Sequence, residues 1–109
     1  MVVRRLVIDD IRVLRGEVTA YARTLAEART LLFSGPWDEV WLDFDMGLAI
    51  VADTLQPLIQ EVEALAHQGT LLPVGQFVIH TANPDGRMAM REALKGYYSL
   101  REVSVGWYF

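Results

Sequence analysis

Acidic residues directly follow two apolar segments of this chain. The apolar run at residues 6–8 (LVI) ends at Asp9 and Asp10, and the run at residues 40–42 (VWL) ends at Asp43. Carboxylates placed together repel one another, so a fold that gathers them usually does so to bind a hard cation such as Mg²⁺. Such a cation holds phosphate oxygens and neutralises charge that develops on them. The alternative is that these residues only end strands and cap turns, for which aspartate is well suited.

A third apolar run, at residues 77–79 (FVI), ends at His80 and Thr81. A histidine at this place could supply or remove a proton near neutral pH. The alternative for His80 is a packed, hydrogen-bonded residue with no chemical role. Asp45, two residues beyond Asp43, could be a further metal ligand at the edge of the site or a cap of the following loop.

The residues after Thr81 indicate the start of a helix that could bind an anion. Asn83 followed by Pro84 is typical of an N-cap with proline at the first helical position. A helix N-terminus offers unpaired N–H groups and a positive dipole end, which suit an anion. Arg87 adds a planar fork of donors able to grip phosphate. The alternative is an ordinary capped turn with a surface arginine, because Asn-Pro and Asp-Gly are common turn dipeptides.

Continuous apolar runs are typical of strands buried on both faces, and therefore of a parallel sheet covered by helices. In such sheets ligands bind beyond the carboxyl ends of the strands, so we expect the acidic residues, His80 and Thr81 to meet at one edge. The order of elements predicts an α/β sandwich around a mostly parallel five-stranded sheet with three helices. The expected strands are residues 3–8, 18–21, 39–45, 76–80 and 103–107, and the expected helices are residues 24–34, 54–68 and 84–95.

Two local signals refine this prediction. Residues 11–17 are too few to hold a helix between the first two strands, because a parallel crossover normally needs about a dozen residues or more. Thr24 and Glu27 match a capping box, which predicts the start of the first helix.

The composition fits one globular domain spanning residues 1–109, with 52% hydrophobic residues to form a buried core. No apolar stretch approaches the roughly 20 residues needed to span a bilayer, so we expect no membrane partner. The chain has no cysteine, which excludes disulfides and thiolate chemistry and fits a reducing, cytoplasmic compartment. A net charge of −4 argues against nonspecific coating of nucleic acid, but allows a site for one phosphate or nucleotide end.

Charged and aromatic residues at the two ends of the chain suggest possible surfaces. Arg4, Arg5, Arg12 and Arg15 could attract phosphate, but we interpret them as a solvated basic group. The aromatic residues 107–109 (WYF) could form a partner surface, through which the protein could dimerise.

Two of these segments carry a family resemblance. Residues 42–47 (LDFDMG) resemble the LDHDLG segment of the cyclic-phosphate-processing receiver domains, a divergent branch of the response-regulator receivers. Residues 79–88 (IHTANPDGRM) are similar to the HSANPxGRxxM segment of the same branch, and the short connection after Asp10 also fits it. The likeness spans nearly the whole chain. It implies a receiver-like, flavodoxin-like fold in which the first and last receiver helices are missing or reduced.

The resemblance also implies a function and roles for the candidate residues. The expected activity is that of a metal-assisted phosphoesterase, which processes a cyclic phosphate on a nucleotide or RNA end. His80 is then the expected general acid or base. Mg²⁺ or Mn²⁺ is expected on the acidic residues Asp9, Asp10, Asp43 and Asp45, of which Asp43 also takes part in catalysis, and the phosphate on Thr81, Asn83 and Arg87.

Departures from the family pattern keep two other functions open. Phe44 stands where the branch has a histidine, and residues 103–109 lack the lysine of ordinary receivers, which argues against phospho-aspartate signalling. The same pocket could bind a cyclic nucleotide or phosphate without turnover. Alternatively, the chain could be a receiver-like interaction domain.

Overall fold

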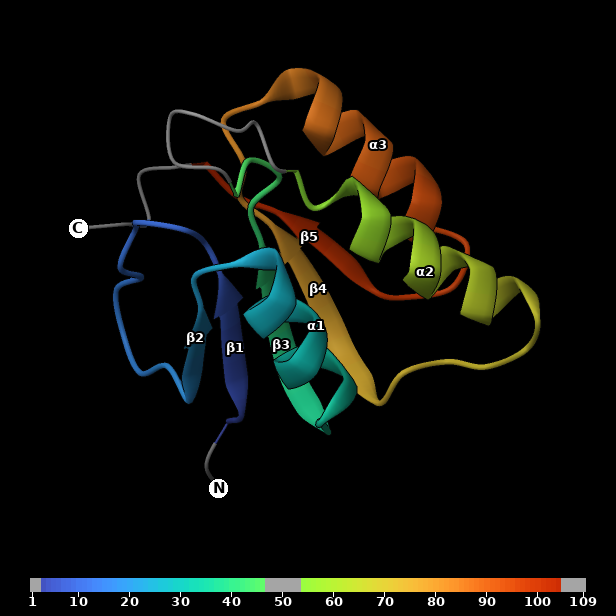
Figure 1. Cartoon of the computed structure of the whole chain (residues 1–109), viewed down its shortest axis with the longest axis horizontal. Coiled ribbons are helices and arrows are strands. Elements are labelled where there is room, and N and C mark those ends of the chain that lie inside the picture. The colour runs from blue at the N-terminus through green and yellow to red at the C-terminus, as the bar shows by residue number, and fades with distance from the viewer. Residues whose placement is uncertain (1–2, 47–53, 105–109) are drawn as a thin grey trace.

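The computed structural model describes residues 3–46 and 54–104 of the chain. Within these ranges the polypeptide forms a parallel sheet with helices packed against it (Figure 1). The elements follow one another as β1 (Arg5–Ile8), β2 (Ala20–Ala22), α1 (Leu25–Phe33), β3 (Trp37–Leu42), α2 (Gln56–His67), β4 (Val74–Ile79), α3 (Pro84–Leu94) and β5 (Leu100–Glu102).

The five strands lie in the order β2-β1-β3-β4-β5, and every neighbouring pair is parallel. β2 therefore lies on one side of β1, while β3, β4 and β5 follow in order on its other side. The ends of the three central strands are level, because Ile8 pairs with Leu42 and Leu42 pairs with Ile79. This is the arrangement that opens a ligand site beyond the carboxyl ends of β1 and β3. The predicted receiver-like α/β fold is confirmed.

All three helices cover one face of the sheet (Figure 1). Alternate residues of the central strands, such as Leu6, Val40 and Phe77, point to this face and are fully buried. Their burial supplies the main driving force for folding, roughly 25 cal/mol for each Å² of apolar surface removed from water. The helix residues that cover them are Ala28, Leu32, Leu58, Ile59, Val62, Met90 and Leu94.

The opposite face of the sheet carries a smaller apolar cluster. Val7, Trp41 and Val78 are buried there together with Leu14, which comes from the connection between β1 and β2. Val18, Tyr21 and Val103 pack against this cluster, and the same face also carries ion pairs among Arg5, Glu39 and Arg101.

The connection between β1 and β2, residues 9–19, contains no helix. This confirms the expectation that the first receiver helix is missing. A segment without a helix must satisfy its backbone groups by other means, and here it does so through side chains of Asp9, Tyr21 and Arg23. The expected absence of a final helix concerns residues beyond 104, which lie outside the described ranges.

The prediction for the last strand was wrong about where the strand begins. The alternation of residues 103–107 pointed to a strand there, but β5 covers Leu100–Glu102 and pairs with residues 77–79 of β4. The reason is that Leu100 packs against the core on the helix-covered face. The alternation of apolar and polar residues at 103–107 gave no indication of this contact. The ladder reaches Val103, whose N–H donates to the carbonyl oxygen of Ile79. Val105 and Trp107 lie outside the described residues.

The N-termini of α1 and α2 can be compared with their predicted starts. The Thr24 hydroxyl accepts from the backbone N–H of Glu27 at 3.1 Å, and the Glu27 carboxylate accepts from the backbone N–H of Arg23 at 3.1 Å. The capping box is therefore present, shifted by one residue in its second bond. α2 begins at Gln56, later than predicted, because Thr54 pairs with Asp45 in an isolated antiparallel bridge.

Among the described residues, no helix is both long enough and apolar enough to cross a membrane.

Candidate functional site

Three acidic side chains converge beyond the carboxyl ends of β1 and β3. One carboxylate oxygen from each of Asp9, Asp10 and Asp43 lies within 4.8 Å of the others. Asp9 and Asp43 are buried and Asp10 is half-buried. The structure thus brings together the carboxylates that the apolar-run-then-aspartate pattern singled out. We call Asp9, Asp10 and Asp43 the acidic group.

Asp9 holds the loop and also faces the site. Its Oδ1 accepts the backbone N–H groups of Ile11 at 3.1 Å and Arg12 at 2.9 Å. Its buried Oδ2 lies 3.3 Å from Nε2 of His80, but receives no well-aligned hydrogen bond from the described residues. A buried carboxylate oxygen left in this condition is costly unless something positive meets it. The acidic group therefore fits a metal ion that binds through oxygen ligands.

The electrostatics of the acidic group point the same way. Burial, together with the negative charge of Asp9, raises the pKa of Asp43 to about 6. Burial and the same neighbouring charge also raise the pKa of Asp10. For Asp9 burial acts in the same direction, but the contact with His80 and the two backbone N–H groups outweigh it, so the Asp9 pKa is lowered. One carboxylate is thus held ionised while its neighbours resist ionisation, as expected of crowded like charges.

His80 and Thr81 follow β4 and are both buried. The His80 ring has 0% exposure and lies against Trp41, with 5.7 Å between ring centroids. Burial lowers the His80 pKa, although the nearby Asp9 carboxylate partly opposes this. The imidazole is therefore neutral near pH 7. The Thr81 hydroxyl accepts the backbone N–H of Asn83 at 3.2 Å and partly restrains the rise in the Asp43 pKa.

Asn83 caps α3 and contacts Asp45. Its Oδ1 accepts the backbone N–H of Gly86 at 3.0 Å, which confirms the predicted N-cap. Its Nδ2 lies 3.4 Å from both carboxylate oxygens of Asp45. Asp45 is exposed and does not belong to the acidic group, so its role as a metal ligand stays a prediction.

Arg87 ties the turn after β4 to the edge of β5. Its Nη2 donates to the carbonyl oxygens of Thr81 at 2.8 Å and Val103 at 3.1 Å, and its Nη1 lies 3.3 Å from Glu102. These contacts fix the backbone that presents Thr81. Binding of phosphate by Arg87 stays a prediction.

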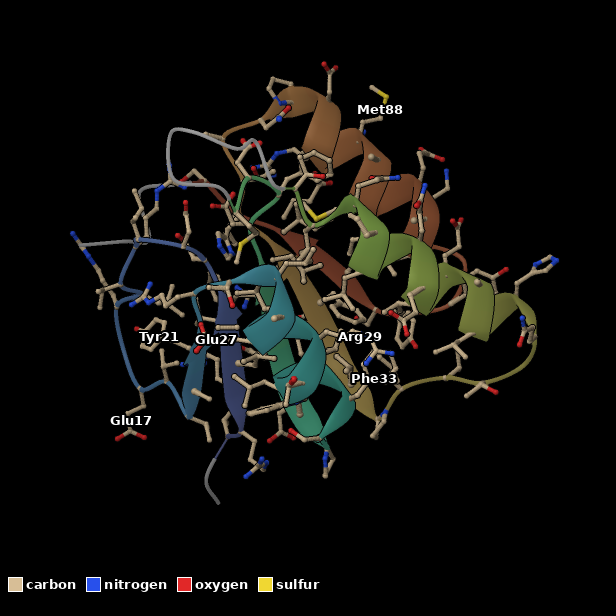
Figure 2. All side chains as sticks on the ribbon, viewed as in Figure 1. Glu17, Tyr21, Glu27, Arg29, Phe33 and Met88 are labelled. Carbon is tan, nitrogen blue, oxygen red and sulfur yellow. The ribbon has the colours of Figure 1, made fainter. Side chains whose placement is uncertain are left out.

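Sequence reasoning missed two residues that hold the β1–β2 connection in place. Nη1 of Arg23 donates to the carbonyl oxygens of Asp9 at 3.1 Å and Arg12 at 2.6 Å, and its guanidinium stacks 4.3 Å from the Tyr21 ring centroid. The Tyr21 hydroxyl accepts the backbone N–H of Leu14 at 3.2 Å. Figure 2 shows Tyr21 between β2 and the connection. The only signal in the sequence was the lack of room for a helix, which means that side chains must bind the backbone instead.

The structure adds an observation on each of two more residues. Phe44, read as the loss of a polar histidine, packs on the first turn of α3, where a Cβ added to Gly86 would lie 2.3 Å from its Cγ. Arg12, read as part of a solvated basic group, has a buried Nη1.

Comparison with known proteins agrees with this geometry. The family described as the cyclic-phosphate processing receiver domain matches residues 4–96, which include every candidate site residue. Neither the curated proteins nor the solved structures give a match. The family match covers most of the chain, from the strand before the acidic group to the end of α3. The chain therefore belongs to the family of cyclic-phosphate processing receiver domains.

Proposed function

We propose that this domain is a metal-assisted phosphoesterase that opens a cyclic phosphate carried by a nucleotide or an RNA end. The observation that carries the proposal is the acidic group itself, with its three carboxylate oxygens within 4.8 Å of one another. Membership of the family supplies the link to cyclic phosphates. In the reaction, water adds to phosphorus and one P–O ester bond breaks. The leaving alkoxide takes up a proton, and the product is a phosphomonoester.

The acidic group is the proposed binding site for Mg²⁺ or Mn²⁺. Both ions favour carboxylate oxygen, and the raised pKa of Asp43, caused by burial and the charge of Asp9, supports this because a nearby positive charge would favour the ionised carboxylate. A divalent ion bound there would polarise a phosphoryl oxygen and neutralise the charge that develops on it. Because Asp45 lies outside the acidic group, its proposed contact with this ion is through a water molecule rather than direct.

The turn before α3 is the proposed phosphate platform. The Thr81 side chain hydrogen-bonds the Asp43 carboxyl, which lowers the Asp43 pKa. Asn83 caps α3 at the positive end of the helix dipole. Arg87 adds a further positive charge, although its donors already hold the carbonyl oxygens of Thr81 and Val103. These residues would orient the cyclic phosphate and hold its phosphorus atom in line with the attacking water.

The role of His80 follows from its burial. A general acid or base must reach the proton that it transfers, whereas the His80 ring is fully buried and contacts Asp9. This favours a positioning role, in which His80 orients the Asp9 carboxylate in the way that outer partners orient metal ligands. His80→Gln separates the two roles. Loss of a titration step from the pH profile of kcat/KM would support proton transfer, while weaker metal affinity with an unchanged profile shape would support positioning.

Turnover of cyclic phosphates tests the proposed function directly. The intact protein, loaded with Mg²⁺ or Mn²⁺, is incubated with 2′,3′-cyclic and 3′,5′-cyclic nucleotides and with RNA ending in a cyclic phosphate. Asp43→Asn serves as the matched inactive control. We expect phosphomonoester product from the wild type alone. Equal, background-level product from both proteins on all these substrates would refute the proposal.

A binding module without turnover is the second candidate, and Phe44 is the observation that favours it. The ring at this position packs on Gly86 and cannot carry a proton. Thermal stabilisation by a cyclic nucleotide that is recovered unchanged would support this candidate, and measurable product would exclude it.

Dimerisation through the aromatic residues 107–109 concerns residues outside the described ranges and stays a prediction. Measuring the molar mass in solution at high protein concentration would test it.

A further inference from the structure

A second group of polar side chains lies on the opposite side of the domain from the acidic group. α2 leads from the carboxyl end of β3 to the amino end of β4, so its last turn lies at the amino ends of the strands (Figure 1). A pocket of about 330 Å³ opens there beside Tyr97, which belongs to the connection between α3 and β5. The residues that line this pocket are Gln60, Glu63, Ala64, His67, Gln68 and Tyr97. None of them takes part in the proposed reaction.

We infer that Glu63 and His67 bind a divalent metal of the kind that accepts imidazole, such as Zn²⁺, at this pocket. The two residues are four positions apart in α2, so their side chains are neighbours on one face of the helix. Two ligands at this spacing on a helix face are a recurring arrangement for binding zinc. His67 is exposed and Glu63 is half-buried, so an ion from solvent can reach both side chains.

The hydroxyl of Tyr97 holds the imidazole of His67 in place. Nδ1 of His67 lies 3.1 Å from the Tyr97 hydroxyl oxygen. A histidine that binds a metal through one ring nitrogen almost always has a hydrogen-bond partner at the other, which fixes the tautomer and the orientation of the ring. When the Nδ1–H of His67 donates to this oxygen, Nε2 carries the lone pair that a metal needs. The structure therefore assigns Nε2 as the ligand atom.

The charges around the pocket favour a cation. Glu61, two residues earlier in α2, is paired with Arg29 at 2.6 Å. The described residues that line the pocket include no lysine or arginine, so no basic side chain competes there for the Glu63 carboxylate. The C-terminal end of a helix also carries a partial negative charge, and His67 lies in the last turn of α2. A positive ion bound at this end of the helix is stabilised by both.

The ligand types distinguish this pocket from the acidic group. Carboxylates alone suit hard ions such as Mg²⁺, whereas imidazole suits Zn²⁺, Ni²⁺ and Cu²⁺. Zinc normally has four ligands, so water or a side chain of another molecule would complete the coordination by Glu63 and His67. The domain would then hold two metal sites of different selectivity, one at each end of its strands.

Calorimetric titration with Zn²⁺ tests this inference. Every protein in the series carries Asp43→Asn, which weakens the acidic group as a competing site. In this background the parent is compared with Glu63→Gln, His67→Gln and Tyr97→Phe. Glu61→Gln is the matched control, because it removes a carboxylate of the same helix that does not line the pocket. The four varied positions are exposed or half-buried, so the variants should fold, and a thermal melt checks that they do.

We expect Tyr97→Phe to weaken Zn²⁺ binding by about 10-fold, because the partner that holds the imidazole is lost. Glu63→Gln and His67→Gln each remove a ligand and should weaken binding further, while Glu61→Gln should bind Zn²⁺ like the parent. Nitrogen NMR of the imidazole locates the bound ion. The Nε2 signal of His67 should move when Zn²⁺ is added and stay unchanged when Mg²⁺ is added.

Zn²⁺ affinity that is equal in His67→Gln and the parent would overturn the inference, as would a parent that binds no Zn²⁺. Affinity that is lost in His67→Gln but kept in Glu63→Gln would overturn the pairing of the two residues. These outcomes do not depend on the proposed function, because the pocket is separate from the acidic group and no turnover is measured.

Discussion

Two segments border the acidic group, and they are held in place by different means. The first is the β1–β2 connection, residues 9–19, which we call the acidic loop. The second is the turn from His80 to Asn83, which we call the capped turn. The acidic loop has no helix and depends on side chains of Asp9, Tyr21 and Arg23. The capped turn leads straight into α3 and is anchored by that helix.

The difference extends to the electrostatics. The pKa values of Asp10, in the acidic loop, and of Asp43 beside it are raised, while that of Asp9 is lowered, so a cation bound on this side of the site would relieve Asp10 and Asp43. On the capped turn, Thr81, Asn83 and Arg87 already make hydrogen bonds to the backbone. We therefore expect binding to change the energy of the acidic loop, with the capped turn as a fixed support. The predictions below test this division.

The largest effect is expected on the fixed support, from Gly86→Ala. In a helix this change normally stabilises by up to about 1 kcal/mol. Here the new Cβ would lie 2.3 Å from Cγ of Phe44, so overpacking should dominate and destabilise the fold by about 3 kcal/mol. Chemical denaturation measures the change.

Two variants sharpen the test of this clash. Gly96→Ala is the matched control, because a Cβ there would meet nothing within 4 Å. Phe44→Gly removes all the side-chain atoms that cause the clash, including the Phe44 Cβ at 2.6 Å, so Gly86→Ala should cost much less in that background. Equal costs in the two backgrounds would show that α3 tolerates the methyl group by shifting, and that the capped turn is not a rigid support.

The next effect concerns the acidic group and should change sign with conditions. Without metal, Asp43→Asn should be more stable than the wild type near neutral pH, by about 2 to 3 kcal/mol. The reason is that the Asp43 pKa is raised to about 6, so ionising this carboxyl costs stability. With Mg²⁺ the order should reverse, because only the wild type keeps the full acidic group.

The pH dependence follows from the same shift. Between about pH 4 and 6, folded Asp43 retains a proton that the unfolded chain has lost, so the wild type loses stability as pH rises through this window. Urea denaturation in a chelator, at several pH values, should show the difference between wild type and Asp43→Asn vanish near pH 4. Asp45→Asn, at an exposed carboxyl two residues away, should not reproduce this pattern. A difference in stability that is constant at all pH values would show that it does not come from ionisation of Asp43.

A smaller effect should separate two surface arginines. Arg23→Ala removes both bonds to the carbonyl oxygens of the acidic loop and should destabilise by about 1 to 2 kcal/mol. Arg29→Ala, the control, removes a more exposed ion pair with Glu61 and should cost less than about 1 kcal/mol. Figure 2 shows Arg29 and Phe33 together on α1, away from Tyr21 and the loop.

Hydrogen exchange locates the effect of these two changes. The amides of Arg12 and Leu14, which donate to Asp9 and Tyr21, should exchange faster in Arg23→Ala and remain unchanged in Arg29→Ala. Protection that is equal in both variants would mean that the loop does not depend on Arg23.

Some features of the fold and of the site could be predicted from the sequence, and others could not. The fold and the acidic group were predictable, because buried parallel strands read as apolar runs and their ends fall at one edge of the sheet. The cap at Asn83 was predictable because capping depends on neighbouring residues alone. What failed depends on contacts between distant segments. Leu100 packs on the core outside the expected alternation, and Arg23 reaches back to Asp9 and leaves no periodic signal.

The smallest effect compares the N-caps of two helices, Asn83 of α3 and Thr24 of α1. Asn83→Ala and Thr24→Ala each remove the side chain that accepts a backbone N–H at the start of a helix, and each should cost about 1 kcal/mol of stability. Asn83 donates its backbone N–H to the Thr81 hydroxyl and contacts Asp45, so we expect Asn83→Ala, and not Thr24→Ala, to weaken phosphate binding in saturating Mg²⁺ as well. Calorimetry of the two variants, matched in stability, measures this. Equal phosphate affinity would confine Asn83 to capping, and would leave the fixed support as a scaffold that presents the backbone without touching the ligand.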